Sequence, residues 1–167
     1  TMITPETLQT IKLQTAVALT SGTSKDFTSI PSGVNRITVM WLDCSLSGTS
    51  RPQVQLGVGG SAVTSGYDCS GAIFSSSSMA STSYTTGWVV YTDAIAAYNS
   101  SGHLILSRID GNKWVGVGQA SNDTSSPYSS TSSGHIGLAG ELDMIRFGTV
   151  NGSDTFDVGT VNISWEF

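Results

Sequence analysis

Apolar and polar residues alternate with a period of two along most of this chain, which is typical of half-buried β-strands. The clearest example is the C-terminal stretch, where the apolar positions are Val161, Ile163, Trp165 and Phe167. The residues between them are polar, so one face of this strand is expected in the core. Because a terminal strand is ordered only when it pairs with an inner strand, we predict that this strand is an integral part of a sheet.

Six more segments predict strands, because they are alternating or short apolar runs bounded by turn residues: 53–59, 87–92, 102–109, 113–119, 134–140 and 142–150. The sequence Asp110-Gly111-Asn112 predicts a tight hairpin, since such turns favour residues that accept a positive φ. Asn151-Gly152 predicts a second hairpin for the same reason. In residues 34–48 the apolar positions change phase after residue 40. This shift predicts either a bulge at residues 40–41 or a strand covered on both faces.

These elements predict an all-β fold, an antiparallel β-sandwich of jelly-roll type. Its predicted core consists of Phe27, Ile37, Val39, Trp41, Leu56, Val89, Leu104, Leu106, Trp114, Ile145, Phe147, Val161, Ile163 and Trp165.

The N-terminal residues differ from the rest of the chain. Thr4 followed by Pro5 resembles a helix start, and Leu8 and Ile11 have helical spacing. We therefore predict a connector over residues 1–16, with a short helix within residues 5–13, and a sandwich domain over residues 17–167. The connector is either a lead-in without structure of its own or a segment whose apolar side chains, including Leu13, pack against copies of themselves.

The composition is rich in small hydroxyl residues and poor in charge. Ser (28), Thr (20) and Gly (19) account for 67 of the 167 residues, and only 11% are charged. The net charge of −5 and the lack of a Lys/Arg cluster argue against nucleic acid as a partner. No apolar run approaches the roughly 20 residues of a membrane-spanning helix, so membrane insertion is not expected.

No motif for catalysis, for a metal or for a cofactor is found. Cys44 and Cys69 either form a disulfide or stay free and buried, and two thiols in a chain of this length are more often free. His103 and His135 occupy similar contexts at predicted strand starts, without a nucleophile motif beside them. Glu141 and Asp143 are spaced to project to the same side of a strand, as a glycosidase pair could use.

Two serine-rich stretches, residues 74–87 and 120–134, predict long loops between strands. Loops of this length in a compact domain are usually either functional or disordered. They are candidates for a binding surface, and the alternative is that both are solvated spacers.

Residues at both ends of the chain resemble a module at the C-termini of tail fibre proteins of tailed bacteriophages. The resemblance rests on the segments DFTSIPSGVNRITVMW, residues 26–41, and LDMIRFGTVNGSDTFDVGTVNISWEF, residues 142–167. It implies a β-sandwich, a homotrimer joined to the rest of the tail fibre, and a location at the fibre tip of the virion. It implies no receptor site, because such a site would lie in the variable middle of the chain.

The function expected from this resemblance is non-enzymatic attachment to a host cell-surface glycan or outer-membrane receptor. The alternatives are a structural trimerisation cap or virion decoration module, and an enzyme that degrades glycans. Because sugar rings stack on aromatic faces, the predicted receptor-binding residues are aromatic and polar side chains at or near the two serine-rich stretches. They are Tyr84, Tyr128, Asn122, Asp123 and Trp88.

Overall fold

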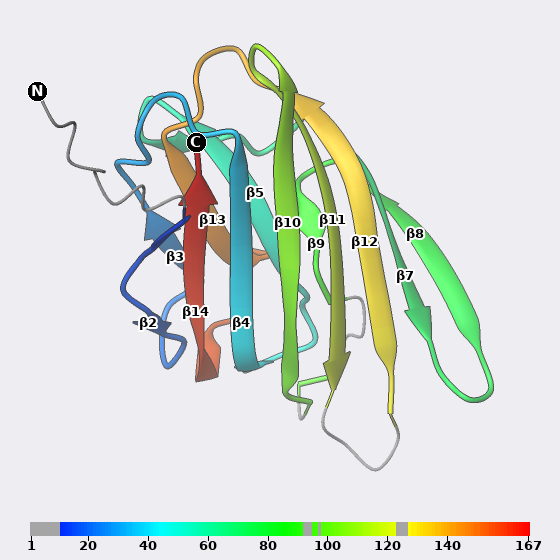
Figure 1. Cartoon of the computed structure of the whole chain (residues 1–167). Helices are drawn as coiled ribbons and strands as arrows, with labels where there is room; N and C mark the ends of the chain where they lie inside the picture. Colours follow the sequence, from blue (N-terminus) through cyan, green and yellow to red (C-terminus); the bar gives the residue numbers. More distant parts are fainter. Residues whose placement is uncertain (1–10, 92–94, 97, 123–126) are drawn as a thin grey trace, which may run out of the picture.

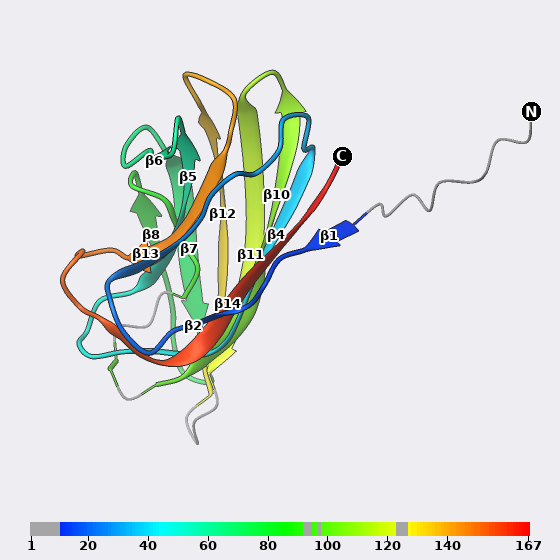
Figure 2. The ribbon, with the colours of Figure 1, turned by 90° about the vertical axis from the view of Figure 1, so that its left-hand side faces the viewer.

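The computed structural model describes residues 11–91, 95–96, 98–122 and 127–167. Two antiparallel sheets pack face to face, which confirms the predicted β-sandwich (Figure 1). Viewed after a quarter turn, the two layers lie on opposite sides of a common core (Figure 2). The described residues contain no helix, and so none that is long and apolar enough to cross a membrane.

The larger sheet, called sheet A, has nine strands in the order β1-β14-β4-β10-β11-β12-β7-β8, with β2 also paired to β14. Its strands are β1 (Ile11–Leu13), β2 (Val17–Ala18), β4 (Arg36–Leu46), β7 (Asp68–Phe74), β8 (Met79–Tyr84), β10 (Ser100–Asp110), β11 (Lys113–Asn122), β12 (Ser129–Gly137) and β14 (Phe156–Glu166). The smaller sheet, sheet B, has the order β3-β13-β5-β6, with β9 also paired to β5. Its strands are β3 (Ser24–Phe27), β5 (Pro52–Val58), β6 (Ser61–Ala62), β9 (Trp88–Val89) and β13 (Met144–Thr149).

The core lies between the two sheets and contains all fourteen of the predicted core residues, each at most 7% exposed. Aromatic rings form its centre. Phe147 lies 5.8 Å from Trp41 and 5.6 Å from Phe156, measured between ring centroids. Tyr67 meets Trp88 edge to face at 5.3 Å. These contacts join the two layers, because Trp41 and Phe156 belong to sheet A and Phe147 to sheet B.

The C-terminal strand is an inner strand, as its alternation predicts. Val161, Ile163 and Trp165 are buried, and β14 pairs with β4 along one edge and with β1 and β2 along the other. The predicted helix does not include Ile11–Leu13, because these residues form strand β1 against β14. The rest of that predicted helix lies outside the described residues.

Of the two predicted turns and the predicted bulge, one turn is confirmed, and the other turn and the bulge differ from the prediction. Gly111, at φ +51°, closes the β10–β11 hairpin as predicted. Asn151-Gly152 does not close a hairpin, because β13 belongs to sheet B and β14 to sheet A, so this turn carries the chain from one layer to the other. The predicted bulge in β4 is present slightly later, at Leu42 and Asp43, where Asp43 has φ +53° and both neighbouring strands shift register.

The two serine-rich stretches are mostly strands, so their prediction as long loops is wrong. Residues 79–84 form β8, the edge strand of sheet A, and Ser129 begins β12 directly after Tyr128. Small hydroxyl side chains fit both faces of these strands. Ser130 and Ser132 point inward and are buried, while Ser129 and Ser133 point outward and are exposed.

Strand β11 places its glycines inside and its valines outside. A Cβ atom at Gly116 would lie 2.8 Å from the side chains of Leu106 and Trp88, so only glycine leaves room for the Trp88 ring. Since side chains alternate along a strand, Val115 and Val117 then face away from the core. Val117 is 54% exposed, and the outer face of sheet A is therefore partly apolar.

The two cysteines are free and buried, which is the more frequent outcome for two thiols in a chain of this length. Burial, with smaller effects from Asp157 on Cys44 and from Asp68 on Cys69, raises the pKa of each thiol to about 12. Both thiols are therefore protonated at neutral pH, and neither is a nucleophile in the folded protein.

Candidate functional site

The outer face of sheet A carries two adjacent rows of polar side chains that cross its central strands. In one row His103 of β10 is paired with Gln119 of β11, and Gln119 with Thr131 of β12. The second row, two residues further along each strand, consists of Ser101, Ser121, Ser129 and Phe74, paired in this order. Because strands lie about 4.8 Å apart, each row is a regular series of side chains across the sheet.

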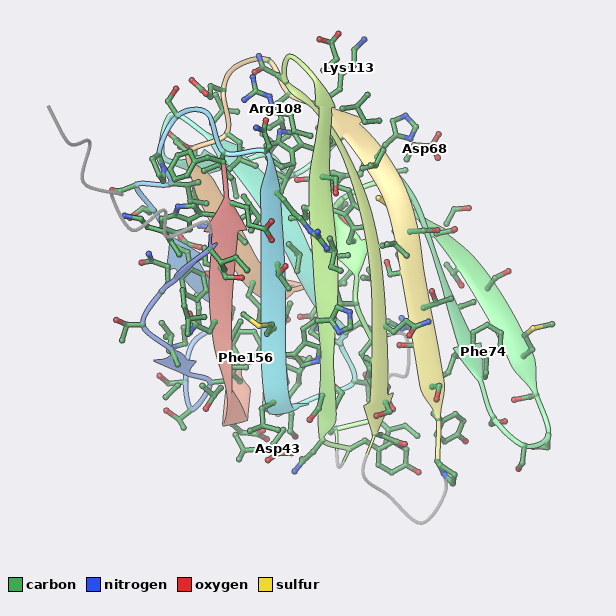
Figure 3. All side chains as sticks on the ribbon, in the orientation of Figure 1. Asp43, Asp68, Phe74, Arg108, Lys113 and Phe156 are labelled. Carbon is green, nitrogen blue, oxygen red and sulfur yellow. The ribbon has the colours of Figure 1, made fainter. Side chains whose placement is uncertain are left out.

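These two rows line a groove of about 390 Å³. The groove is hollow because its middle holds only small side chains, those of Ser101, Ser121 and Ser129. Larger side chains border it: His103 and Gln119 on one side, and Phe74 at the end. Figure 3 shows Phe74 at the same end of the sheet as Asp43, while Arg108, Lys113 and Asp68 lie at the opposite end.

Most polar groups in the groove are available to a ligand. The side chains of His103, Gln119, Ser121 and Ser129 form no hydrogen bond or ion pair with any residue that the structure describes. Ser101 Oγ accepts a hydrogen bond of 3.0 Å from the Asp43 N–H and keeps its own proton to donate. The Thr131 hydroxyl donates to the Gly118 carbonyl at 3.2 Å and keeps its lone pairs to accept.

Phe74 supplies an aromatic surface beside these polar groups. It is 40% exposed, although it belongs to a strand, because its neighbours in the row are Ser129 on β12 and Met79 on the edge strand β8. An exposed ring next to free hydroxyl, amide and imidazole groups is the combination that binds a sugar, which has polar hydroxyls and apolar C–H faces.

A second groove of similar size, about 390 Å³, lies on the outer face of sheet B, but its longest polar side chains, those of Gln53, Gln55 and Arg146, already form hydrogen bonds. The Thr86 hydroxyl donates to Gln53 Oε1 at 3.1 Å, and Gln55 Nε2 donates to the Thr86 carbonyl at 2.8 Å. Arg146 binds both carboxylate oxygens of Asp26 at 2.7 Å. A ligand here would have to replace existing bonds, so the groove on sheet A is the stronger candidate.

The structure separates the residues that sequence reasoning assigned to the receptor site. Trp88 is fully buried against Tyr67, so its inclusion is corrected: its ring cannot reach a ligand. Tyr84 is partly buried and packs against the core. Its partner on β7 is Cys69, which pairs with Gly134 of β12. Gly134 is six residues from Tyr128, so Tyr84 and Tyr128 lie roughly 20 Å apart along the direction of the strands.

Two of the predicted residues flank the groove, and one is not described. Asn122 and Tyr128 follow and precede the groove residues Ser121 and Ser129 in the chain. The Asn122 carboxamide oxygen accepts a 2.8 Å hydrogen bond from the Tyr128 N–H, and the Tyr128 ring lies 6.2 Å from that of Tyr98. These interactions fix the ends of β11 and β12. Asp123 lies outside the described residues.

The acidic residues that suggested a glycosidase pair have structural partners instead. Glu141 accepts hydrogen bonds of 3.0 Å from the Gly33 N–H and from the Ser32 hydroxyl. These bonds, in that order, and the nearby Arg108 hold the pKa of Glu141 below its ordinary value. Asp143 accepts from the Gly60 N–H at 3.0 Å. Within the described part of the chain, no group of three or more His, Cys, Asp or Glu residues could hold a metal ion.

Sequence reasoning missed Phe74, His103 and Gln119 as site residues. His103 and Gln119 alternate with Leu104 and with Gly118, so the strand period alone places them on the outer face. The turn predicted at Gly111 also pairs β10 with β11. Apart from one register shift between Arg108 and Asp110, this pairing places His103 opposite Gln119. Comparisons with protein-family models, with curated protein sequences and with solved structures found no match to this chain.

Proposed function

We propose that this chain is the distal domain of a bacteriophage tail fibre, which attaches the virion to a host cell-surface glycan without catalysing a reaction. The observation that carries the proposal is the groove on sheet A, where free hydroxyl, carboxamide and imidazole groups lie beside the exposed Phe74 ring. The sequence resemblance at the two ends of the chain supports the virion location.

The orientation of the groove agrees with such a role. Ile11, the first described residue, pairs with Glu166 near the C-terminal end of β14. Figure 1 shows the turn between β7 and β8 toward the other end of sheet A, and the groove residue Phe74 is the last residue of β7 before this turn. A shaft that joins the chain at its N-terminus would therefore leave the groove on the distal half of the domain.

We propose that the domain acts as a homotrimer. Three apolar side chains on the outer face of sheet A support self-association: Leu13, Leu42 and Val117 are 66%, 59% and 54% exposed. They lie on β1, β4 and β11, which are separated by β14 and β10, so they would act as separate contacts on one face and do not form a continuous apolar patch. Three linked sites also raise the apparent affinity for a surface without any new contact at each site.

The test is attachment of fluorescently labelled protein to a panel of bacterial strains. The double variant Phe74→Ala, Gln119→Ala should lose attachment to any strain that the unaltered protein labels. The matched control is Ser107→Ala, on the outer face of the neighbouring strand β10 and outside both the groove and the apolar residues assigned to the trimer. Equal attachment by the double variant would contradict the assignment of the groove.

The exposed apolar residues also favour a second candidate, a structural trimerisation cap. Light scattering separates the two functions, because a cap must be trimeric but need not bind cells. A trimer that labels no strain in the panel would favour the cap. If the protein is monomeric and still labels cells through the groove, the proposed attachment stands and the proposed homotrimer is contradicted.

A further inference from the structure

We propose that the groove on sheet A takes an uncharged, linear glycan that lies across β10, β11 and β12 with one sugar ring against Phe74. This inference rests on the proposed function and adds the class of the glycan and its direction on the sheet. It follows from the spacing of the polar groups, from the distribution of charge and from the position of the aromatic ring.

The spacing favours an extended glycan chain. His103, Gln119 and Thr131 repeat at the strand separation of about 4.8 Å, and Ser101, Ser121 and Ser129 form a second series about 7 Å away. A strand separation is close to the length of one sugar residue in a linear polymer. Successive sugars can therefore meet equivalent pairs of side chains from successive strands.

The charge distribution argues against an acidic glycan. All seven Lys and Arg residues of the chain belong to the described residues, and none lines the groove. Carboxylate and phosphate groups are normally bound by Arg or Lys, because they only accept hydrogen bonds and lose hydration on binding. Asp43 contacts the groove only through its backbone N–H, which donates to Ser101 Oγ, so it offers no cationic group to an anion.

The free groups in the groove match neutral hydroxyls. A sugar hydroxyl both donates and accepts, and the groove offers both functions through the Gln119 carboxamide and the serine hydroxyls. The remaining lone pairs of Thr131 accept, and the free proton of Ser101 donates. A neutral glycan can thus form hydrogen bonds along the whole groove without leaving a buried charge.

Phe74 gives the bound chain one preferred end. Phe74 belongs to β7, the strand next to β12, and pairs with Ser129 in the second row. Its ring would therefore contact the sugar that follows the one above β12. An aromatic ring prefers the apolar C–H face of a sugar ring, which orients that unit roughly parallel to Phe74. The groove therefore takes about four sugar units, one above each of β10, β11, β12 and β7.

The experiment measures the affinity of the full chain for oligosaccharides of one to six units by calorimetry and by saturation-transfer NMR. The neutral probes are β-1,4-linked N-acetylglucosamine, α-1,6-linked glucose and β-1,3-linked glucose, and the acidic probe is oligogalacturonate. We expect at least one neutral series to bind, with an affinity that rises up to about four units and then levels off. Phe74→Ala should weaken this binding about five- to tenfold.

A matched pair of variants on β12 locates the binding site. Ser129→Trp fills the groove, whereas Ser133→Trp adds the same ring to the same face of the same strand outside it. The first should weaken binding by more than tenfold, and the second by less than twofold. Unchanged binding by Ser129→Trp would overturn the assignment of the groove.

Three further outcomes would overturn the proposed ligand class. They are tighter binding of oligogalacturonate than of every neutral series, an affinity that is independent of length, and the absence of binding by all neutral probes. The cell-attachment assay distinguishes a failure of the proposed ligand class from a failure of the proposed attachment function. If Ser129→Trp still labels cells, attachment stands without this groove, and if the unaltered protein labels no strain, attachment itself fails.

Discussion

Replacement of Ile163 by alanine tests the two-residue period on which the description of sheet A depends. Ile163 is fully buried on β14, opposite Val39 of β4, with the equally buried Val161 on the same face. The substitution removes three methyl or methylene groups, which are worth about 0.8 kcal/mol each in transfer from water, or about 2.4 kcal/mol together. A cavity term is added to this loss, because the surrounding structure relaxes only partly.

The cavity at Ile163 is expected to stay open. The backbone of β14 is hydrogen-bonded on both sides, to β4 along one edge and through the Ile163 carbonyl to the Gln14 N–H at 2.9 Å along the other. The strand therefore cannot move inward to fill the space. We expect a total loss of about 3–4 kcal/mol, in the upper part of the usual range for such substitutions.

Urea unfolding followed by tryptophan fluorescence measures this loss, provided that the slope of the transition is unchanged. The corresponding fall in melting temperature is about 6–16 °C for a chain of this length. Ser164→Ala is the matched control, because Ser164 is the next residue and points outward, and it should change stability by less than about 0.5 kcal/mol. A loss of that small size for Ile163→Ala would refute the assigned inward face of β14.

Three other outcomes follow from the structure. Gly116→Ala should lower the free energy of unfolding by about 1–3 kcal/mol, because the new Cβ would lie 2.8 Å from the Trp88 ring, whereas Gly137→Ala has open space and should be near neutral in the same urea titration. The two thiols, whose pKa is raised to about 12 chiefly by burial, should react with a thiol reagent at pH 8 only after denaturation, and rapid labelling of the native protein would contradict their burial. The pKa of Glu141 is lowered chiefly by the hydrogen bond from the Gly33 N–H, so its carboxylate stabilises the fold at neutral pH. This stabilisation is lost as the pH falls below 4.5. The free energy of unfolding of Glu141→Gln should therefore decline less steeply with falling pH in that range than that of the unaltered protein.

The alternation of the sequence predicted the core because large apolar residues occupy every second position of the long strands. β14 and the first half of β4 show this clearly, with Ile37 and Val39 inside and Thr38 between them. The pattern failed where the inward side chains are small. In β12 the buried residues Ser130 and Ser132 and the exposed residues Ser129 and Ser133 are all serines. Because inward and outward positions carry the same residue type, no alternation is visible and the sequence predicts a loop there.

The site could be predicted only in part, for a related reason. The outward positions of His103 and Gln119 follow from the period of their strands, but their neighbours across β12 and β7 do not. Those contacts depend on the pairing of serine-rich strands that are distant in sequence, such as Ser129 with Phe74. The sequence pattern places Phe74 at the start of a predicted loop, and only the pairing of β7 with β12 and β8 shows that its exposed ring belongs to a strand.

The location of the groove on paired strands changes how the proposed attachment is expected to work. Each groove side chain stands on a backbone that neighbouring strands hold on both sides, from β4 to β8. Binding then orders few groups, and little of the interaction energy is lost to conformational entropy. Loops of serine would have to be ordered at a cost of about 1–2 kcal/mol per residue, which weak sugar contacts could not offset. A shallow site of neutral groups can therefore attach a particle only if its groups are already in place, and the sheet provides that condition where the serine-rich loops would not.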